Sequence, residues 1–317
     1  MWFHTLFLIL KSARPRQWIK NIALYAALFF SGFLFYDPVD GLPYFVIVTF
    51  AAIIFSLLTS SIYLINDVMD IKEDAKHPFK KRRPIASGEL PVNTALITSG
   101  LGLLVVFILS LALPFFFRIL LLTYLGLQLL YATKIKHASI FDVISIALGF
   151  LIRIYAGAVV VNLHMSVWFL LTVVSASLFL AVGKRQSERT LLQNREVDFA
   201  RKTLKNYSQR LLDQYTGMFA NATWLTYALF SFQHETDYIE SASLRFPSLY
   251  VLLPRTLQSQ KLLMLTLPFV IFGVMRYLQL VYEENQGESP EKVLLNDKAL
   301  LSTVLIFGLV AFFVIYG

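Results

Sequence analysis

Nine long apolar segments divide the chain, and polar stretches of varied length separate them. They lie at about 18–36, 44–65, 92–112, 115–133, 139–161, 165–183, 211–232, 261–282 and 299–316. Each is long enough to cross the roughly 30 Å hydrocarbon core of a bilayer as a helix. Helix is required there because backbone groups in lipid must hydrogen-bond within their own segment. The pattern predicts an all-α polytopic membrane protein with nine transmembrane helices, in which Pro114 leaves only a tight turn between the third and fourth.

The first residues, MWFHTLFLIL, are apolar, but the positive residues follow them and no small-residue cleavage site is present. This order argues against a signal peptide. We expect an interfacial helix that lies on the membrane ahead of the first span.

Lysine and arginine are unevenly distributed between the two sides that nine spans create. One side carries 22 of the 28 and the other carries four, with Arg153 and Arg276 inside spans. The positive-inside rule then places the N-terminus in the cytoplasm, across an inner or plasma membrane, and the C-terminus on the opposite side. Two long charged loops, at about 67–91 and 184–210, share the cytoplasmic face. We therefore expect residues 1–317 to form a single transmembrane catalytic domain with a cytoplasmic active site.

Composition narrows the function classes. The chain is 57% hydrophobic and 15% charged, whereas soluble domains average about 45–50% and about 25%. A soluble protein is therefore excluded, and nucleic acid is not an expected partner. The chain contains no cysteine, so disulfides, thiolate nucleophiles and zinc–sulfur sites are excluded as well.

An acidic motif at the end of the second span is the strongest chemical feature. The segment from Asn66 reads NDVMDIKED and places Asp67, Asp70 and Asp74 at i, i+3 and i+7. If the helix continues for two turns, Asp67 and Asp74 lie about 20° apart and Asp70 about 60° away, so all three share a face. Oxygen ligands of this kind favour Mg²⁺, usually shared with substrate phosphates. The alternative is a solvated helix end whose acids pair with neighbouring lysines.

A basic cluster follows the acids, in the sequence HPFKKRRPIASG. Its positive residues are His77, Lys80, Lys81, Arg82 and Arg83. Such residues beside a metal-bound diphosphate would neutralise the charge on a departing group. They would equally serve as an anchor on anionic lipid.

Two further positions are candidates for ligand contact. Arg153 lies in the middle of the fifth span, where a guanidinium facing lipid is costly. Asp142 lies about three turns earlier on the same face. Arg153 would hold the phosphate of a lipid or form a structural ion pair with another helix. Lys136 belongs to the short basic turn after the fourth span and serves either topology or ligand binding.

Several ordered motifs carry a resemblance that spans essentially the whole chain. They are RPRQWIKN (14–21), NDVMDIKED, HPFKKRRPIASG, YATKIKH (131–137) and GKRQSE (183–188). With NDxxDxxxD at the end of a second span, the sequence resembles the UbiA-type superfamily of intramembrane prenyltransferases, and within it the decaprenyl-phosphate phosphoribosyltransferase branch. The resemblance implies nine helices bundled around a central cavity that opens sideways to lipid, and a trimer is compatible with it.

The resemblance also implies roles for individual residues. Asn66, Asp67, Asp70 and Asp74 would bind Mg²⁺ and a diphosphate. Lys80, Arg83, Lys184 and Arg185 would contact phosphate. Together with Asn66, Lys136, Arg153 and Glu188 they make up the expected substrate-binding residues.

One departure from the wider superfamily bears on the substrate. Aromatic prenyltransferases carry a second acidic motif after the sixth span, whereas this chain reads GKRQSERTLLQNREVD there. A basic pocket suits a donor with an additional phosphate. The expected activity is transfer of 5-phosphoribose from phosphoribosyl diphosphate to a polyprenyl phosphate of decaprenyl type. Prenyl transfer from a polyprenyl diphosphate to an aromatic acceptor is the alternative, and a transporter is a third hypothesis.

Overall fold

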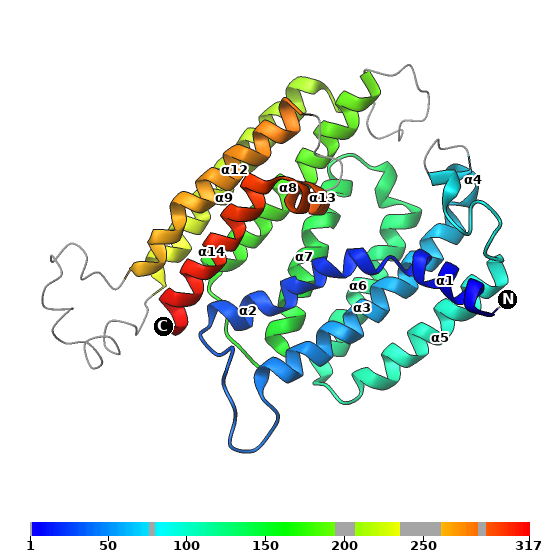
Figure 1. The fold of residues 1–317 in the computed structure, drawn as a ribbon, viewed down its shortest axis with the longest axis horizontal. Coiled ribbons are helices and arrows are strands. Elements are labelled where there is room, and N and C mark those ends of the chain that lie inside the picture. The colour runs from blue at the N-terminus through cyan, green and yellow to red at the C-terminus, as the bar shows by residue number, and fades with distance from the viewer. Residues whose placement is uncertain (1, 76–79, 194–206, 235–260, 285–289) are drawn as a thin grey trace, which may run out of the picture. The chain divides into compact units, whose positions relative to one another are not determined.

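The computed structural model describes residues 2–75, 80–193, 207–234, 261–284 and 290–317, and the regular elements among them are helices (Figure 1). The described residues form two compact units. The first consists of 2–75 and 80–164, and the second of 165–193, 207–234, 261–284 and 290–317. The predicted all-helical class is confirmed, whereas the single domain and the central cavity stay predictions.

The first unit is built around α3. Its α-helices are α1 (Trp2–Ala13), α2 (Tyr25–Phe30), α3 (Tyr44–Met69), α4 (Ile71–Asp74), α5 (Val92–Ser110), α6 (Phe115–Thr133) and α7 (Phe141–Val159). Its 3₁₀ helices are η1 (Pro15–Leu24), η2 (Lys80–Arg82) and η3 (Ile135–His137). Within this unit α3 packs against α1, α5, α6, α7 and η1. The spans of α3 and α7 have 50% and 56% of their residues buried, against 17% and 22% for α5 and α6. Within this unit, α3 and α7 are therefore the more buried helices and α5 and α6 the more exposed ones.

The segment expected to form the first span has a different local structure. Residues 18–36 are not one continuous helix: η1 passes into α2, which ends at Phe30. Gly32 then adopts a positive φ of 80°, a conformation that ends the helix and that glycine tolerates without a Cβ clash. Ahead of η1, α1 confirms the helix expected at the N-terminus, and its interfacial position stays a prediction.

Seven helices of the described residues are long and apolar enough to cross a membrane. They are Tyr44–Met69, Val92–Ser110, Phe115–Thr133, Phe141–Val159, Val167–Thr190, Leu262–Tyr282 and Lys298–Tyr316. Each coincides with a predicted span, and Pro114 N-caps α6 after a short turn, as expected. The predicted span at 211–232 is helical but is not among the seven. The protein is thus an integral membrane protein with multiple helical spans, and the count of nine stays a prediction.

The second unit is a separate helical cluster. Its helices are α8 (Val167–Gln193), α9 (Gln209–Gln233), η5 (Leu262–Thr266), α12 (Leu267–Tyr282), α13 (Pro290–Asn296) and α14 (Lys298–Tyr316). Helix α8 packs on α9 and α12, and α12 packs on α14. Gly183 permits a close approach, because a Cβ there would lie 2.8 Å from the Tyr277 ring.

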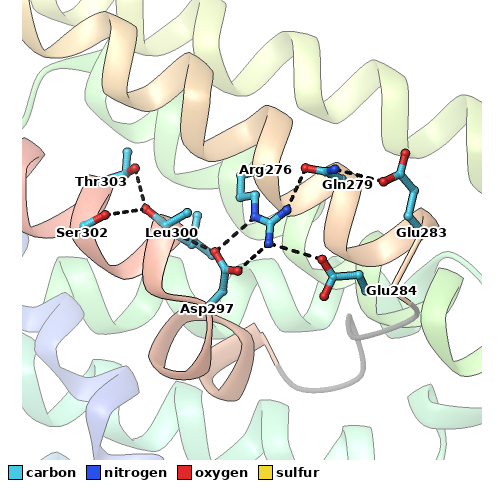
Figure 2. A network of polar contacts seen from close by, with 9 residues as sticks. Arg276, Gln279, Glu283, Glu284, Asp297, Leu300, Ser302 and Thr303 are labelled. Atoms are coloured by element: carbon cyan, nitrogen blue, oxygen red, sulfur yellow. Dashed lines mark hydrogen bonds and ion pairs between the residues drawn. The ribbon is translucent and has the colours of Figure 1, made fainter.

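Helices α12 and α14 are also joined by a polar network (Figure 2). Arg276 donates to both carboxylate oxygens of Asp297, through Nε at 3.2 Å and Nη2 at 2.6 Å. Asp297 in turn accepts from the backbone N–H of Leu300 at 2.7 Å and so caps α14. Arg276 also contacts Glu284 at 3.3 Å. Hydrogen bonds from Arg276 lower the pKa of Asp297. Arg276 therefore has a structural role here, and we assign it no chemistry.

One predicted loop is wrong in its extent. The stretch at 184–210 begins inside α8, which continues as helix to Gln193. The predicted loop began where the apolar run ends. The helix continues beyond that point because no proline interrupts it. The residues Lys184, Arg185 and Glu188 are therefore helical. His77 and residues 194–198 of this basic stretch lie outside the described residues.

Candidate functional site

The acidic motif occupies the end of α3 and the single turn that follows it. Asp67 lies in the last turn of α3, Asp70 breaks the helix with φ −92° and ψ 6°, and Asp74 ends α4. Backbone bonds from Asp74 N and Glu73 N to Asp70 O, at 2.8 and 3.0 Å, continue the helical path through the break. The predicted helical continuation is confirmed, with an interruption at Asp70.

Arg83 joins the first and last of these aspartates. Its Nη1 lies 3.1 Å from Asp67 Oδ1 and 2.5 Å from Asp74 Oδ2. Both carboxylates are buried, with side-chain exposures of 3% and 4%. Because one nitrogen reaches both, Asp67 and Asp74 share a face, as their spacing predicts.

The turn that carries Arg83 is anchored to the first unit's core. Ile85 and Leu90 are buried in a cluster with Leu64 of α3. Backbone bonds from Ser87 N to Arg83 O and from Leu90 N to Pro84 O, both 2.8 Å, close the turn. Apolar packing of the IASGEL segment thus brings Arg83 back onto α3. Lys80 begins η2 in the same segment, and its carbonyl accepts from Arg83 N at 2.9 Å.

A second arginine reaches Asp67 from far earlier in the chain. Arg14 Nη2 donates to Asp67 Oδ1, and its guanidinium lies 4.9 Å from the centroid of the Tyr63 ring. Arg14 has the left-handed backbone conformation φ 53°, ψ 61°, and Pro15 follows it at the start of η1. A non-glycine residue in that region is strained, and the surrounding structure must hold it there.

Asp70 points to a different cation. Lys136, in η3, contacts Asp70 Oδ1 at 2.8 Å and Glu73 Oε2 at 3.6 Å. Three cationic side chains thus converge on the acids of one helix end: Arg14 just ahead of η1, Arg83 between η2 and α5, and Lys136 in η3. This arrangement offsets the mutual repulsion of the carboxylates.

The donor set fits Mg²⁺ in its chemistry. All of its members are oxygens, and Asn66 Oδ1 is buried with no hydrogen-bond partner among the described residues. The guanidinium of Arg83 lies between the carboxylates of Asp67 and Asp74, so this position favours positive charge. No three Asp, Glu or His side chains of the described residues converge on one point. An ion held by all three aspartates therefore stays a prediction.

The second unit carries a polar group at the C-terminal end of α8. Arg185 is 1% exposed and pairs with Glu188 Oε2 at 2.5 Å, one helical turn on. Gln186 donates to Asp213 Oδ1 at 2.9 Å, and Tyr282 donates to the same oxygen at 3.0 Å. The basic character expected of this segment is present, and the substrate roles of Lys184, Arg185 and Glu188 stay predictions.

Arg153 is buried in α7 and bonded to neutral groups. Its Nε donates to Asn21 Oδ1 at 3.0 Å, Nη1 to Gly149 O at 3.0 Å and Nη2 to Tyr124 Oη at 2.5 Å. Within the described part of the chain it has no acidic partner, so the ion-pair alternative is not seen there. Asp142 is also buried, in the first turn of α7.

Two of these residues were missing from the predicted site. Arg14 and Asn21 both belong to RPRQWIKN, but positive residues ahead of an apolar run are also typical of a topological anchor. The one sequence feature that pointed to these two residues was that RPRQWIKN is among the ordered motifs that carry the family resemblance. A contact across 53 positions in sequence could not be derived from it.

The helical spans define an integral membrane protein, and a charged cluster lies at the end of α3. The sequence profile of the UbiA prenyltransferase family matches residues 23–302, and the chain belongs to this family. The predicted family is confirmed.

The chain is similar in sequence to two relatives and in fold to one solved structure. It is 33% identical over 296 residues to the decaprenyl-phosphate phosphoribosyltransferase of Mycolicibacterium smegmatis, covering 92% of this chain and 87% of that protein. It is 34% identical over 233 residues to the protein of the same name from Mycobacterium tuberculosis, covering 72% and 74%. A UbiA homolog from Archaeoglobus fulgidus bound to DMAPP and Mg²⁺ matches with a TM-score of 0.66 over 97% of this chain and 98% of that one. At 17% identity this last likeness concerns the fold alone.

Proposed function

We propose that the protein transfers 5-phosphoribose from phosphoribosyl diphosphate to a polyprenyl phosphate of decaprenyl type and releases diphosphate. The observation that carries the proposal is the identity of 33% over 92% of the chain to a decaprenyl-phosphate phosphoribosyltransferase. The concentration of guanidinium and ammonium groups around the end of α3 supports it, because such groups bind phosphate oxygens.

In this proposal the first unit binds the diphosphate of the donor. Asn66, Asp67, Asp70 and Asp74 would hold Mg²⁺, which when bound would neutralise the diphosphate and favour its departure. The surrounding positive groups would contact phosphate oxygens directly. They are Arg14, Lys80, Arg83 and Lys136.

The reaction needs little proton transfer from the protein. A phosphate oxygen of the lipid, already anionic at neutral pH, attacks C1 of the ribose. The bond between C1 and the diphosphate oxygen breaks, its electron pair leaves with the diphosphate, and the configuration at C1 inverts. Positive groups preorganised at the leaving oxygens stabilise this charge more in the transition state than in the ground state.

The basic end of α8 supports a phosphorylated donor. Lys184 and Arg185 stay candidate contacts of a substrate phosphate, and Glu188 pairs with the Arg185 guanidinium at 2.5 Å. We keep Arg153 as a candidate contact of the lipid phosphate, since its three hydrogen bonds leave two of its five N–H groups for a ligand. The cytoplasmic position of the site and a trimeric assembly remain predictions.

The test is an assay with purified protein, Mg²⁺, phosphoribosyl diphosphate and a polyprenyl phosphate. We expect a phosphoribosyl lipid and one diphosphate per product. Turnover of a prenyl diphosphate with an aromatic acid, without a phosphoribosyl lipid, would instead support the alternative prenyltransferase activity.

A further inference from the structure

The 3₁₀ segment η1 is longer than such helices usually are. It runs for ten residues, whereas 3₁₀ runs beyond three or four residues are uncommon because their hydrogen bonds have poorer geometry. At its start, Arg14 has a strained backbone. Contacts from outside η1 must therefore stabilise both features.

One set of contacts comes from α3, which η1 and α2 follow in the antiparallel direction. The pairs are Arg14 with Asp67, Trp18 with Ser60 at 2.9 Å, Asn21 with Ser56 at 2.9 Å and Tyr25 with Thr49 at 2.8 Å. The residue numbers rise along η1 and α2 while those of their partners fall along α3. The four pairs therefore define one antiparallel register between the two segments.

The 3₁₀ form supplies the length that this register requires. From Thr49 to Asp67 an α-helix rises roughly 27 Å. The facing residues from Arg14 to Tyr25 rise about 22 Å as a 3₁₀ helix but only about 16 Å as an α-helix. The 3₁₀ form leaves a difference of about 5 Å from the length of this part of α3, which long side chains at the two ends can span, whereas the α-helical form leaves about 11 Å. An α-helical η1 would draw Arg14 away from Asp67.

A second set of contacts comes from α7 and fixes the other end of η1. A Cβ on Gly157 would lie 1.8 Å from Leu24 O, so the backbones of α7 and η1 touch there. One turn earlier on α7, Arg153 donates to Asn21 Oδ1 at 3.0 Å while Asn21 Nδ2 donates to Ser56 at 2.9 Å. The Asn21 amide thus links α7 to α3 through η1.

Arg153 is itself held rigidly. Gly149 O and Tyr124 Oη fix two of its nitrogens, and its guanidinium lies 4.9 Å from the Tyr124 ring centroid and 5.4 Å from that of Phe150. A lysine there would keep the charge but could not reproduce a planar fork with three directed bonds.

We infer that Arg153, acting through Asn21, is a positioning residue that keeps η1 in its extended 3₁₀ register and so holds Arg14 against Asp67. The inference rests on the proposed function in one respect: Arg14 is taken to contribute to binding of the phosphoribosyl donor.

The test combines hydrogen exchange with kinetics on the full-length protein in lipid nanodiscs. Arg153→Lys should increase amide exchange over residues 15–24 by about tenfold and raise KM for phosphoribosyl diphosphate. Arg14→Gln should raise the same KM by about tenfold, and the double variant should be no more than about threefold worse than Arg14→Gln alone, because both act through one contact.

Matched variants separate this role from a general loss of folding. Ile22→Ala changes an exposed side chain of η1 (62% exposed) and should leave exchange and KM unchanged. Tyr124→Phe removes one hydroxyl from Arg153 and should reproduce part of the Arg153→Lys effect if that variant does not fold.

The inference is overturned if exchange over 15–24 is unchanged in Arg153→Lys and Tyr124→Phe, if the kinetic effects of Arg14 and Arg153 multiply, or if only KM for the lipid phosphate changes. If the wild-type protein transfers no phosphoribose, the proposed function fails, and the exchange measurement alone decides the positioning role.

Discussion

Replacing Arg83 by alanine is the most informative single change in the first unit. Its Nη1 lies 3.1 Å from Asp67 and 2.5 Å from Asp74, and both carboxylates are buried. Removing one partner of a fully buried ion pair costs about 3–5 kcal/mol. Arg83 is 26% exposed and Asp67 keeps Arg14, so solvent and the second arginine reduce this cost to roughly 1–3 kcal/mol.

The effect on turnover should exceed the effect on stability. Loss of one preorganised group at a site of developing negative charge lowers turnover by about 10²–10³. We expect Arg83→Ala to lower kcat/KM for phosphoribosyl diphosphate by this factor. Arg83→Lys should lie between it and wild type, because lysine keeps the charge but lacks the fork.

The assay measures initial rates and thermal unfolding in detergent for each variant, with Arg82→Ala as the matched control. Arg82 is the exposed neighbour of Arg83, so its removal tests the general positive charge of the segment. If Arg83→Ala stays within about threefold of wild type, or if Arg82→Ala loses as much activity, the segment serves as a membrane-surface anchor and the reasoning is refuted.

Three further changes test separate parts of the account. Asp67→Ala should abolish turnover while the protein stays folded in detergent; retained activity would remove its assigned role in metal binding. The lowered pKa of Asp297 means that its contact with Arg276 stabilises the fold above the unfolded pKa of about 3.9 and that this contribution is lost as pH falls through the lower folded value. Unfolding midpoints measured below pH 5 should therefore depend less on pH in Asp297→Asn, and an unchanged pH profile would contradict the linkage. Gly183→Ala places a Cβ 2.8 Å from the Tyr277 ring and should destabilise by about 1–3 kcal/mol in thermal unfolding; a neutral effect would show that the ring moves freely.

Hydropathy was sufficient to predict most of the helices, because a lipid environment requires both an apolar run and a helical backbone. Hydropathy was insufficient where an apolar run and a helix do not have the same bounds. α8 continues beyond its apolar run to Gln193, and the apolar run at 18–36 is only partly helical. Hydropathy also carries no information about 3₁₀ structure in η1, which depends on contacts with α3 and α7.

The candidate site was predictable in its local part only. The spacing of Asp67 and Asp74 places them on one helix face, and the structure brings them to the same nitrogen of Arg83. The divergence of Asp70 toward Lys136 depends on a helix break and on a contact 66 residues away in sequence. Arg14 reaches Asp67 through tertiary packing as well, so helical periodicity alone could not identify either cation.

The most direct test of the central claim is an experimental structure of the protein with phosphoribosyl diphosphate and Mg²⁺. The account predicts the diphosphate beside Asp67 and Asp74, with Arg83 on its oxygens. A donor bound elsewhere, with Arg83 still closed on the two aspartates, would contradict it.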